Sequence, residues 1–525
     1  MRKKLATKIC AIVMTAAMVA SMAGCGDDSG DNSQASTPGS SEAGDPGQES
    51  GGADSQESEA PDDSQEEEET YDFGGAVVRV QGGSFNALDE ENKLDDKGNV
   101  KSDYTKKRDI ADQLEQKYNI KIEYAKLNTD GYDEISAVVT PITNGEAHAD
   151  IFCGRESVMI GAREYLADIT ADVDQLEIGS TYIEPGTFGG KVLGWTYDDM
   201  GNAYVLAYSR SYLKSIGMEK TPTDMFMEGK WDYDSCRTYL SDLKAKLPDG
   251  TYPISVHPNH WSSMGPAANG VVRVDSDSNV NFLEQGYISA MEFYRSLVVD
   301  QLAGQTEIKE ITETGGISLD IPYGTGDMSG KAGEPGKYVL TMVEAWQFED
   351  VLKKTEDWGI VPFPWDPALV TCTGDYTTLS DNYLIPQSLW TNVMVPKAEY
   401  RGEGAKTIPD IVLHKIASDF YAMDNPNGGK VRHEEWLAES KGETYVNRGY
   451  NPDDPGKFTN EQDIEISSWM HSRSGCDWGW GFNDNGIAKV FRCAQYIISG
   501  HQDARTAGES FVNEANENLK QMGLK

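Results

Sequence analysis

The sequence predicts an α/β protein with two lobes and a helical C-terminal part. Residues 76–154 alternate strand-like and helix-like patterns in the order β, α, β, α, β. Such alternation favours a parallel sheet with right-handed crossovers. About 450 residues of ordinary globular composition follow residue 72. That length exceeds one core at ~100–200 residues per domain, so two lobes are expected.

The first lobe begins with a clear series of elements. The stretch AVVRVQGG, residues 76–83, predicts a buried strand closed by a glycine pair. Ile110, Leu114 and Tyr118 recur every four residues and predict a helix. A second strand at 121–127, a helix at 132–143 and a third strand at 149–154 follow. In such sheets ligands bind beyond the carboxyl ends of the strands.

Helical patterns dominate the later part of the chain. Residues 287–298 carry one apolar stripe, and residues 486–499 form another apolar segment. Ala507, Phe511, Ala515 and Leu519 lie four apart near the C-terminus. These spacings predict three amphipathic helices.

The N-terminus has the pattern of an export signal. Arg2, Lys3, Lys4 and Lys8 precede an uncharged, mostly apolar run that ends in small residues before Cys25. The run is shorter than the ~20 residues of a membrane span. We therefore expect residues 1–24 to be a signal peptide; an ordinary signal with an incidental Cys25 remains the alternative.

An acidic segment follows, at residues 25–72. Residues 27–72 contain sixteen Asp or Glu and no Lys or Arg, within a chain of net charge -40. This composition predicts a disordered tether. Nucleic acid and anionic lipid are poor partners for such a charge.

The cysteines and short motifs give no metal or cofactor site. After Cys10 and Cys25, five scattered cysteines remain without a C-x-x-C spacing, so small buried thiols are expected; a Cys476–Cys493 bridge stays open. Motifs resembling a zincin, a calcium loop and a P-loop each lack a required residue. We expect no metal and no cofactor.

Several segments follow one another along the chain: AHADIF with EYLADIT, FGGKVLGWTYDD, KWDYDSCRTYLSDLKAKLPDGTYPI, YISAMEFYRSLVVDQLA, GKYVLTMVEAWQFED, WGIVPFPWDP and IISGHQDARTAGESFVNEANENLK. In this order they resemble extracellular solute-binding lipoproteins of bacterial ABC importers, the sugar-type family that includes the maltose-binding protein. Met22-Ala23-Gly24-Cys25 resembles the bacterial lipobox. Ser209-Arg210 stands where the family has an Asn-Lys pair, which is a departure.

This resemblance implies a two-lobed periplasmic-binding-protein fold of type II with a hinge. Lobe 1 is expected at residues 73–200 and 380–430, and lobe 2 at 201–379 and 431–525. The protein would be a monomer without enzymatic activity. It would capture a carbohydrate, as an oligosaccharide, and deliver it to ABC permease subunits. A lipid (palmitate-type) anchor at Cys25 would hold it to the cell membrane, facing outward, as its only membrane contact.

The resemblance also assigns candidate ligand-binding residues by position. Trp346 falls where the family places a stacking tryptophan, and Tyr197, Asp198 and Asp199 fall near a hinge carboxylate. Arg155 and Glu156 follow the third strand, and Asp477, Trp478 and Trp480 lie in the glycine-rich CDWGWGF. Core packing is the alternative for any tryptophan, and it is favoured for Trp195, Trp231 and Trp358.

Three other functions remain open. The same fold could bind a peptide, a modified sugar or a polyamine. A lipid-anchored glycoside hydrolase is a second alternative, because chance carboxylate pairs are expected in so acidic a chain. A sensor or adhesin without a permease is the third. A saturable ligand without turnover, and membrane proteins encoded beside the gene, would separate them.

Overall fold

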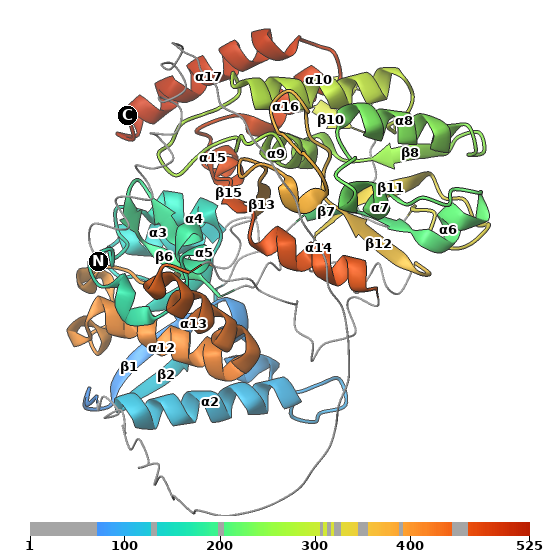
Figure 1. The fold of residues 1–525 in the computed structure, drawn as a ribbon. Coiled ribbons are helices and arrows are strands. Elements are labelled where there is room, and N and C mark those ends of the chain that lie inside the picture. Colours follow the sequence, from blue (N-terminus) through green and yellow to red (C-terminus); the bar gives the residue numbers. More distant parts are fainter. Residues whose placement is uncertain are drawn as a thin grey trace, which may run out of the picture. The chain divides into compact units, whose positions relative to one another are not determined.

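The computed structural model describes residues 71–127, 134–197, 204–304, 308–311, 317–319, 327–344, 355–387, 392–443 and 460–525. Residues 68–525 form one compact unit. Two mixed sheets, each with its own helices, make up this unit (Figure 1).

The first sheet has the strand order β2-β1-β3-β14-β6. Its strands are β1 (Ala76–Gln81), β2 (Ile120–Tyr124), β3 (Ile151–Gly154), β6 (Gly194–Thr196) and β14 (Asn392–Met394). β1 pairs in parallel with both β2 and β3, which confirms the predicted parallel arrangement. β14 arrives from the C-terminal half of the chain and pairs antiparallel with β3 and β6.

Helices of the first sheet include the two that the sequence predicts, α2 and α3. The helices are α2 (Ser102–Tyr118), α3 (Glu134–Thr143), α4 (Glu156–Ala162), α5 (Ser180–Ile183), α12 (Asp410–Asp424) and α13 (Pro426–Lys441). Ile110, Leu114 and Tyr118 are buried on one face of α2, and Asn119 ends the helix with a left-handed φ of 47°. α2 lies against α12 (Figure 1).

The second sheet has the order β12-β7-β11-β8. Its strands are β7 (Tyr204–Ser209), β8 (Tyr252–Ser255), β11 (Tyr338–Glu344) and β12 (Trp358–Val361). β8 and β11 are parallel, and β7 runs antiparallel to both of its neighbours. Both parallel strands therefore end at the same edge, where β7 begins.

Helices of the second sheet include the three amphipathic helices that the sequence predicts. The helices are α6 (Arg210–Ser215), α7 (Pro222–Met227), α8 (Tyr233–Lys244), α9 (Pro258–Ala267), α10 (Gln285–Val299), α14 (Glu461–His471), α15 (Gly479–Asp484), α16 (Val490–Ile498) and α17 (Ala504–Gln521). Side-chain caps fix several starts; Asp232 accepts from the amide of Ser235 at α8, and Asp503 from that of Thr506 at α17.

Three short strand pairs lie outside these two sheets. They are β4 (Thr187–Phe188) with β5 (Lys191–Val192), β9 (Ile308–Ile311) with β10 (Ile317–Leu319), and β13 (Ile385–Gln387) with β15 (Ser474–Cys476).

Two apolar clusters hold the fold. The smaller joins the first sheet to α2 and α12 and contains Trp195. The larger contains Trp231 and Trp358 of the second half together with Phe152 and Phe188 of the first. These three tryptophans are at most 3% exposed, which confirms that they pack in the core.

The five cysteines after Cys25 are free in the structure. Cys236 and Cys493 are buried and the other three are half-buried, so the Cys476–Cys493 bridge is not formed. Within the described ranges, no helix is long and apolar enough to cross a membrane. The same ranges hold no group of three His, Cys, Asp or Glu suited to a metal ion.

Candidate ligand-binding site

The carboxyl ends of the parallel strands mark where a ligand site is expected in each sheet. In the first sheet, β1 ends at Gln81 and β3 at Gly154. In the second sheet, β8 ends at Ser255 and β11 at Glu344. The side chains that follow these residues are the candidates.

Two glycines and two tyrosines pack together at the edge of the first sheet where β1 ends. Gly83 has φ 53°, and a Cβ there would lie 2.5 Å from the hydroxyl of Tyr421 and 2.6 Å from that of Tyr197. A Cβ at Gly82, φ 83°, would lie 2.6 Å from the carbonyl oxygen of Cys153. The rings of Tyr197 and Tyr421 stack with centroids 3.6 Å apart. The predicted glycine pair is therefore required by close packing at the strand end.

Arg155 and Glu156 follow β3 and begin α4. Arg155 is the N-cap residue, and its Nε lies 3.3 Å from Oε2 of Glu134. Glu156 is only 1% exposed, and its Oε2 has no hydrogen-bond partner among the described residues. Burial raises the pKa of Glu156 to about 8, and the carboxylates of Asp484 and Asp477 add to the shift. Glu156 is therefore largely protonated at neutral pH.

The edge of the second sheet carries Tyr204, His257, His260 and Glu344. Nε2 of His260 lies 3.8 Å from Oε1 of Glu344, and its ring lies 5.8 Å from that of Tyr204 and 5.9 Å from that of His257. Burial lowers the pKa of His257 to about 4 and that of His260 to about 3. Both imidazoles are neutral at pH 7, so the contact with Glu344 is not an ion pair there.

Asp477, in the CDWGWGF segment, accepts hydrogen bonds that hold this segment against the rest of the protein. Its Oδ2 accepts hydrogen bonds from Nε of Arg273 and from Oγ of Ser263, both at 2.6 Å. Its Oδ1 accepts from the amide of Gly479 at 2.9 Å. Both carboxylate oxygens are thus committed within the protein.

The two tryptophans of this segment have different surroundings. Trp478 is 0% exposed and packs on Phe188, with ring centroids 4.9 Å apart. Trp480 is half-buried and lies 5.6 Å from His260 and 4.3 Å from Phe491, measured between ring centroids.

α15 brings the two edges together. A Cβ at Gly481 would lie 2.7 Å from Cγ of Glu156, while the preceding residue, Trp480, contacts His260. Nδ2 of Asn485 also donates to the carbonyl oxygen of Ser157, at 2.8 Å. One short helix therefore touches α4 after β3 and α9 after β8.

The predicted site residues divide into three groups. Glu156, Asp477, Trp478 and Trp480 gather around α15, as described above. Arg155 and Tyr197 lie at the edge of the first sheet. Trp346, Asp198 and Asp199 lie outside the described residues, as do Cys25, the signal segment and residues 25–70 of the tether.

Sequence reasoning missed Tyr204, His257, His260, Glu344 and Tyr421. A signal for the histidines existed, because HPNH directly follows the strand-like TYPISV. Glu344 is the last residue of β11, two positions before Trp346. Tyr421 carried no such signal, because it comes from the last turn of α12, far from any strand end in the sequence.

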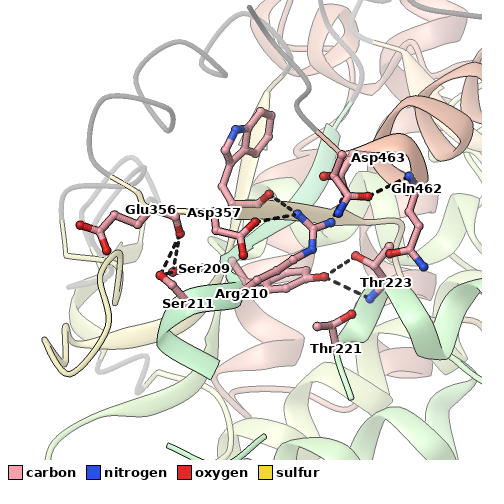
Figure 2. A network of polar contacts seen from close by, with 12 residues as sticks. Ser209, Arg210, Ser211, Thr221, Thr223, Glu356, Asp357, Gln462 and Asp463 are labelled. Atoms are coloured by element: carbon pink, nitrogen blue, oxygen red, sulfur yellow. Dashed lines mark hydrogen bonds and ion pairs between the residues drawn. The ribbon is translucent and has the colours of Figure 1, made fainter. Parts of the chain in front are cut away.

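The Ser209-Arg210 pair, which departs from the family pattern, joins three segments beside the second sheet. Nη2 of Arg210 donates to Oδ1 of Asp463 at 2.7 Å, and Nη1 donates to the carbonyl oxygen of Trp358 (Figure 2). Oγ of Ser209 donates to the carbonyl oxygen of Glu356 at 2.8 Å (Figure 2). Arg210 thereby ties α14 to β12 and to the end of β7.

No protein-family model matches the chain, and no curated protein matches it. Solved structures do match, among them the galacto-N-biose-/lacto-N-biose I-binding protein of the ABC transporter from Bifidobacterium longum. The TM-score is 0.54 at 16% identity, over 87% of this chain and 100% of that one. The cyclic alpha-maltosyl-1,6-maltose binding protein from Arthrobacter globiformis gives 0.53 at 12%, over 85% and 100%. UgpB from Mycobacterium tuberculosis, in complex with glycerophosphocholine, gives 0.50 at 12%, over 86% and 100%.

This chain has the solute-binding-protein fold of the maltose-binding type. The α/β fold class and the two-lobed architecture predicted from the sequence are confirmed by these neighbours. Glu156 and Tyr197 lie at the edge of the first sheet, and His260 and Glu344 lie at the edge of the second.

Proposed function

We propose that this protein is the solute-binding component of an ABC importer and captures a carbohydrate between its lobes. The observation that carries the proposal is the solute-binding fold, shared with proteins whose names state sugar ligands. Aromatic and polar side chains lie together at the strand edges, which suits sugar rings with apolar faces and hydroxyl rims. Delivery to permease subunits follows from this role.

The ligand contacts we propose are Arg155, Glu156, Tyr197 and Trp480, with Tyr204, His260 and Glu344 added. Trp346, Asp198 and Asp199 remain proposed contacts on the basis of the family resemblance. Asp477 and Trp478 stay predictions as direct contacts. The hydrogen bonds of both Asp477 oxygens to the protein, and the packing of Trp478 on Phe188, support an indirect role.

A lipid on Cys25 would anchor the protein to the outer side of the cytoplasmic membrane, with residues 25–72 as a tether. The sequence order of signal, cysteine and acidic segment supports this part of the proposal. A monomer that touches the membrane only through its lipid fits capture of solute near a permease.

Thermal unfolding with a ligand panel tests the function. A ligand at a hundredfold excess over its Kd adds about 2.7 kcal/mol to the free energy of unfolding. We expect maltotetraose, lacto-N-biose or another oligosaccharide to raise the Tm and to remain uncleaved after long incubation. A shift with glycerophosphocholine, peptides or polyamines alone would refute the sugar assignment, and saccharide cleavage would favour the hydrolase.

A further inference from the structure

Arg273 is a buried cation that lies against the CDWGWGF segment, which contains Trp480. Its side chain is 0% exposed, and it lies between α9 and the turn that starts α15. Nε donates to Asp477 at 2.6 Å, while Nη1 donates to Oγ of Ser262 at 3.1 Å and to the carbonyl oxygen of Asn259 at 3.3 Å. The guanidinium is therefore fixed from both α9 and the Asp477 side.

The turn from Asp477 to Trp480 packs closely against this guanidinium. A Cβ at Gly479 would lie 2.7 Å from Nε of Arg273, so glycine lets the backbone approach the charge. Cζ of Arg273 lies 6.0 Å from the centroid of the Trp480 ring. The guanidinium thus contacts Asp477, two residues before Gly479, and Trp480, directly after it.

We propose that the Arg273–Asp477 ion pair positions the Trp480 indole for contact with the solute. This inference rests on the proposed function, because it assumes that Trp480 touches the ligand. Trp480 lies in the first turn of α15, and its neighbours Gly479 and Gly481 have no side chain that could fix the indole. The orientation of the indole is then set by what lies around it, namely Arg273, His260 and Phe491. An arginine suits this role because its planar guanidinium can donate hydrogen bonds to several acceptors and, at the same time, face an aromatic ring.

A stabilising pair without any positioning role is the competing explanation, and the chain offers a matched control. Arg401 is also 0% exposed; it donates to the carbonyl oxygens of Pro396 and Ile408 and pairs with Asp410. It lies beside the first sheet, after β14. Arg401→Lys should disturb a buried arginine of equal burial without touching Trp480.

The test is 19F NMR of the 5-fluorotryptophan-labelled full chain, which has 11 tryptophans. Trp480→Phe identifies the resonance of Trp480. We expect Arg273→Lys to shift or broaden this resonance, and Ser263→Ala, which removes one hydrogen bond to Asp477, to do so more weakly. Arg401→Lys should leave it in place. An unmoved Trp480 resonance in both Arg273→Lys and Ser263→Ala, or the same change in Arg401→Lys, would overturn the proposal.

Saccharide titration separates this inference from the proposed function. Suppose that maltotetraose or lacto-N-biose moves the Trp480 resonance of the unmodified protein. In Arg273→Lys, about tenfold higher concentration of the same saccharide should be needed for the same change. Equal affinity in the two proteins would refute positioning for ligand contact. If neither saccharide binds the unmodified protein, the sugar assignment fails, while the unliganded spectra still decide whether Arg273 orients the indole.

Discussion

Glu156 is a carboxyl group whose surroundings favour its neutral form. It is 1% exposed, and Asp484 and Asp477 lie near enough to oppose a further negative charge. Arg155 acts in the opposite direction, but its Nε faces Glu134. The folded protein therefore keeps a proton on Glu156 that the unfolded chain releases at ordinary pH.

This proton predicts a pH dependence of stability. The pKa of Glu156 in the folded protein, about 8, lies above the ordinary glutamate value of 4.5. Between these values the folded state binds more protons, so the free energy of unfolding falls as pH rises. Glu156→Gln should remove this loss. At pH 8 it should raise the free energy of unfolding by an amount on the order of a few kcal/mol, and the Tm with it. Near pH 4 the two proteins should unfold alike.

Urea unfolding at pH 4, 6 and 8 measures the effect. Glu134→Gln, at a partly exposed carboxyl, is the control and should follow the unmodified protein. Parallel curves for Glu156→Gln and the unmodified protein would show that Glu156 is ionised in the folded state.

At the scale of elements, α14 is attached to the second sheet through a buried ion pair. Asp463 is 1% exposed; besides Arg210, its Oδ1 accepts from the amide of Ile360 in β12 at 3.1 Å. Burial raises the pKa of Asp463, and the hydrogen bond from Arg210 opposes that shift. The pair links two segments far apart in the sequence.

Asp463→Ala should leave the largely buried Arg210 with Asp357, 3.9 Å away, as its remaining carboxylate partner among the described residues, and cost about 3 kcal/mol of stability. Hydrogen exchange should show the largest loss of protection in α14. The exposed pair Lys220–Glu228 serves as the control, since Glu228→Ala should cost less than about 1 kcal/mol. Uniform loss of protection across both sheets would contradict local attachment of α14 by this pair.

The elements predicted from the sequence are those with a long periodic pattern. β1, α2, β2 and β3, and later α10, α16 and α17, follow their apolar spacing closely. β6 and β14 were not predicted, because three residues carry no period and their place depends on pairing with distant strands. The site was partly predicted for the same reason. Trp480 stands in the recognisable glycine-rich segment CDWGWGF. In contrast, Arg273 reaches Trp480, and Tyr421 reaches Tyr197, only through the tertiary fold.

At the scale of the whole molecule, the proposed anchor gives a test of localisation. Only a thiol can accept the lipid, so Cys25→Ser should move the protein from the membrane fraction to the released fraction. The melting profile should stay unchanged, because the described unit starts well after residue 25. Fractionation with immunodetection measures the result, and retention of Cys25→Ser in the membrane would argue against lipidation.

The central place of β14 in the first sheet also constrains how the chain folds. A chain made from its N-terminus carries β3 and β6 long before residues 392–394 exist. Until then, no strand lies between β3 and β6, and the backbone hydrogen-bonding groups that these two strands present to β14 are unpaired. Contacts of such long sequence separation slow folding. The first half of this protein therefore cannot mature independently of the second, and a chain truncated before β14 would expose a strand edge open to aggregation.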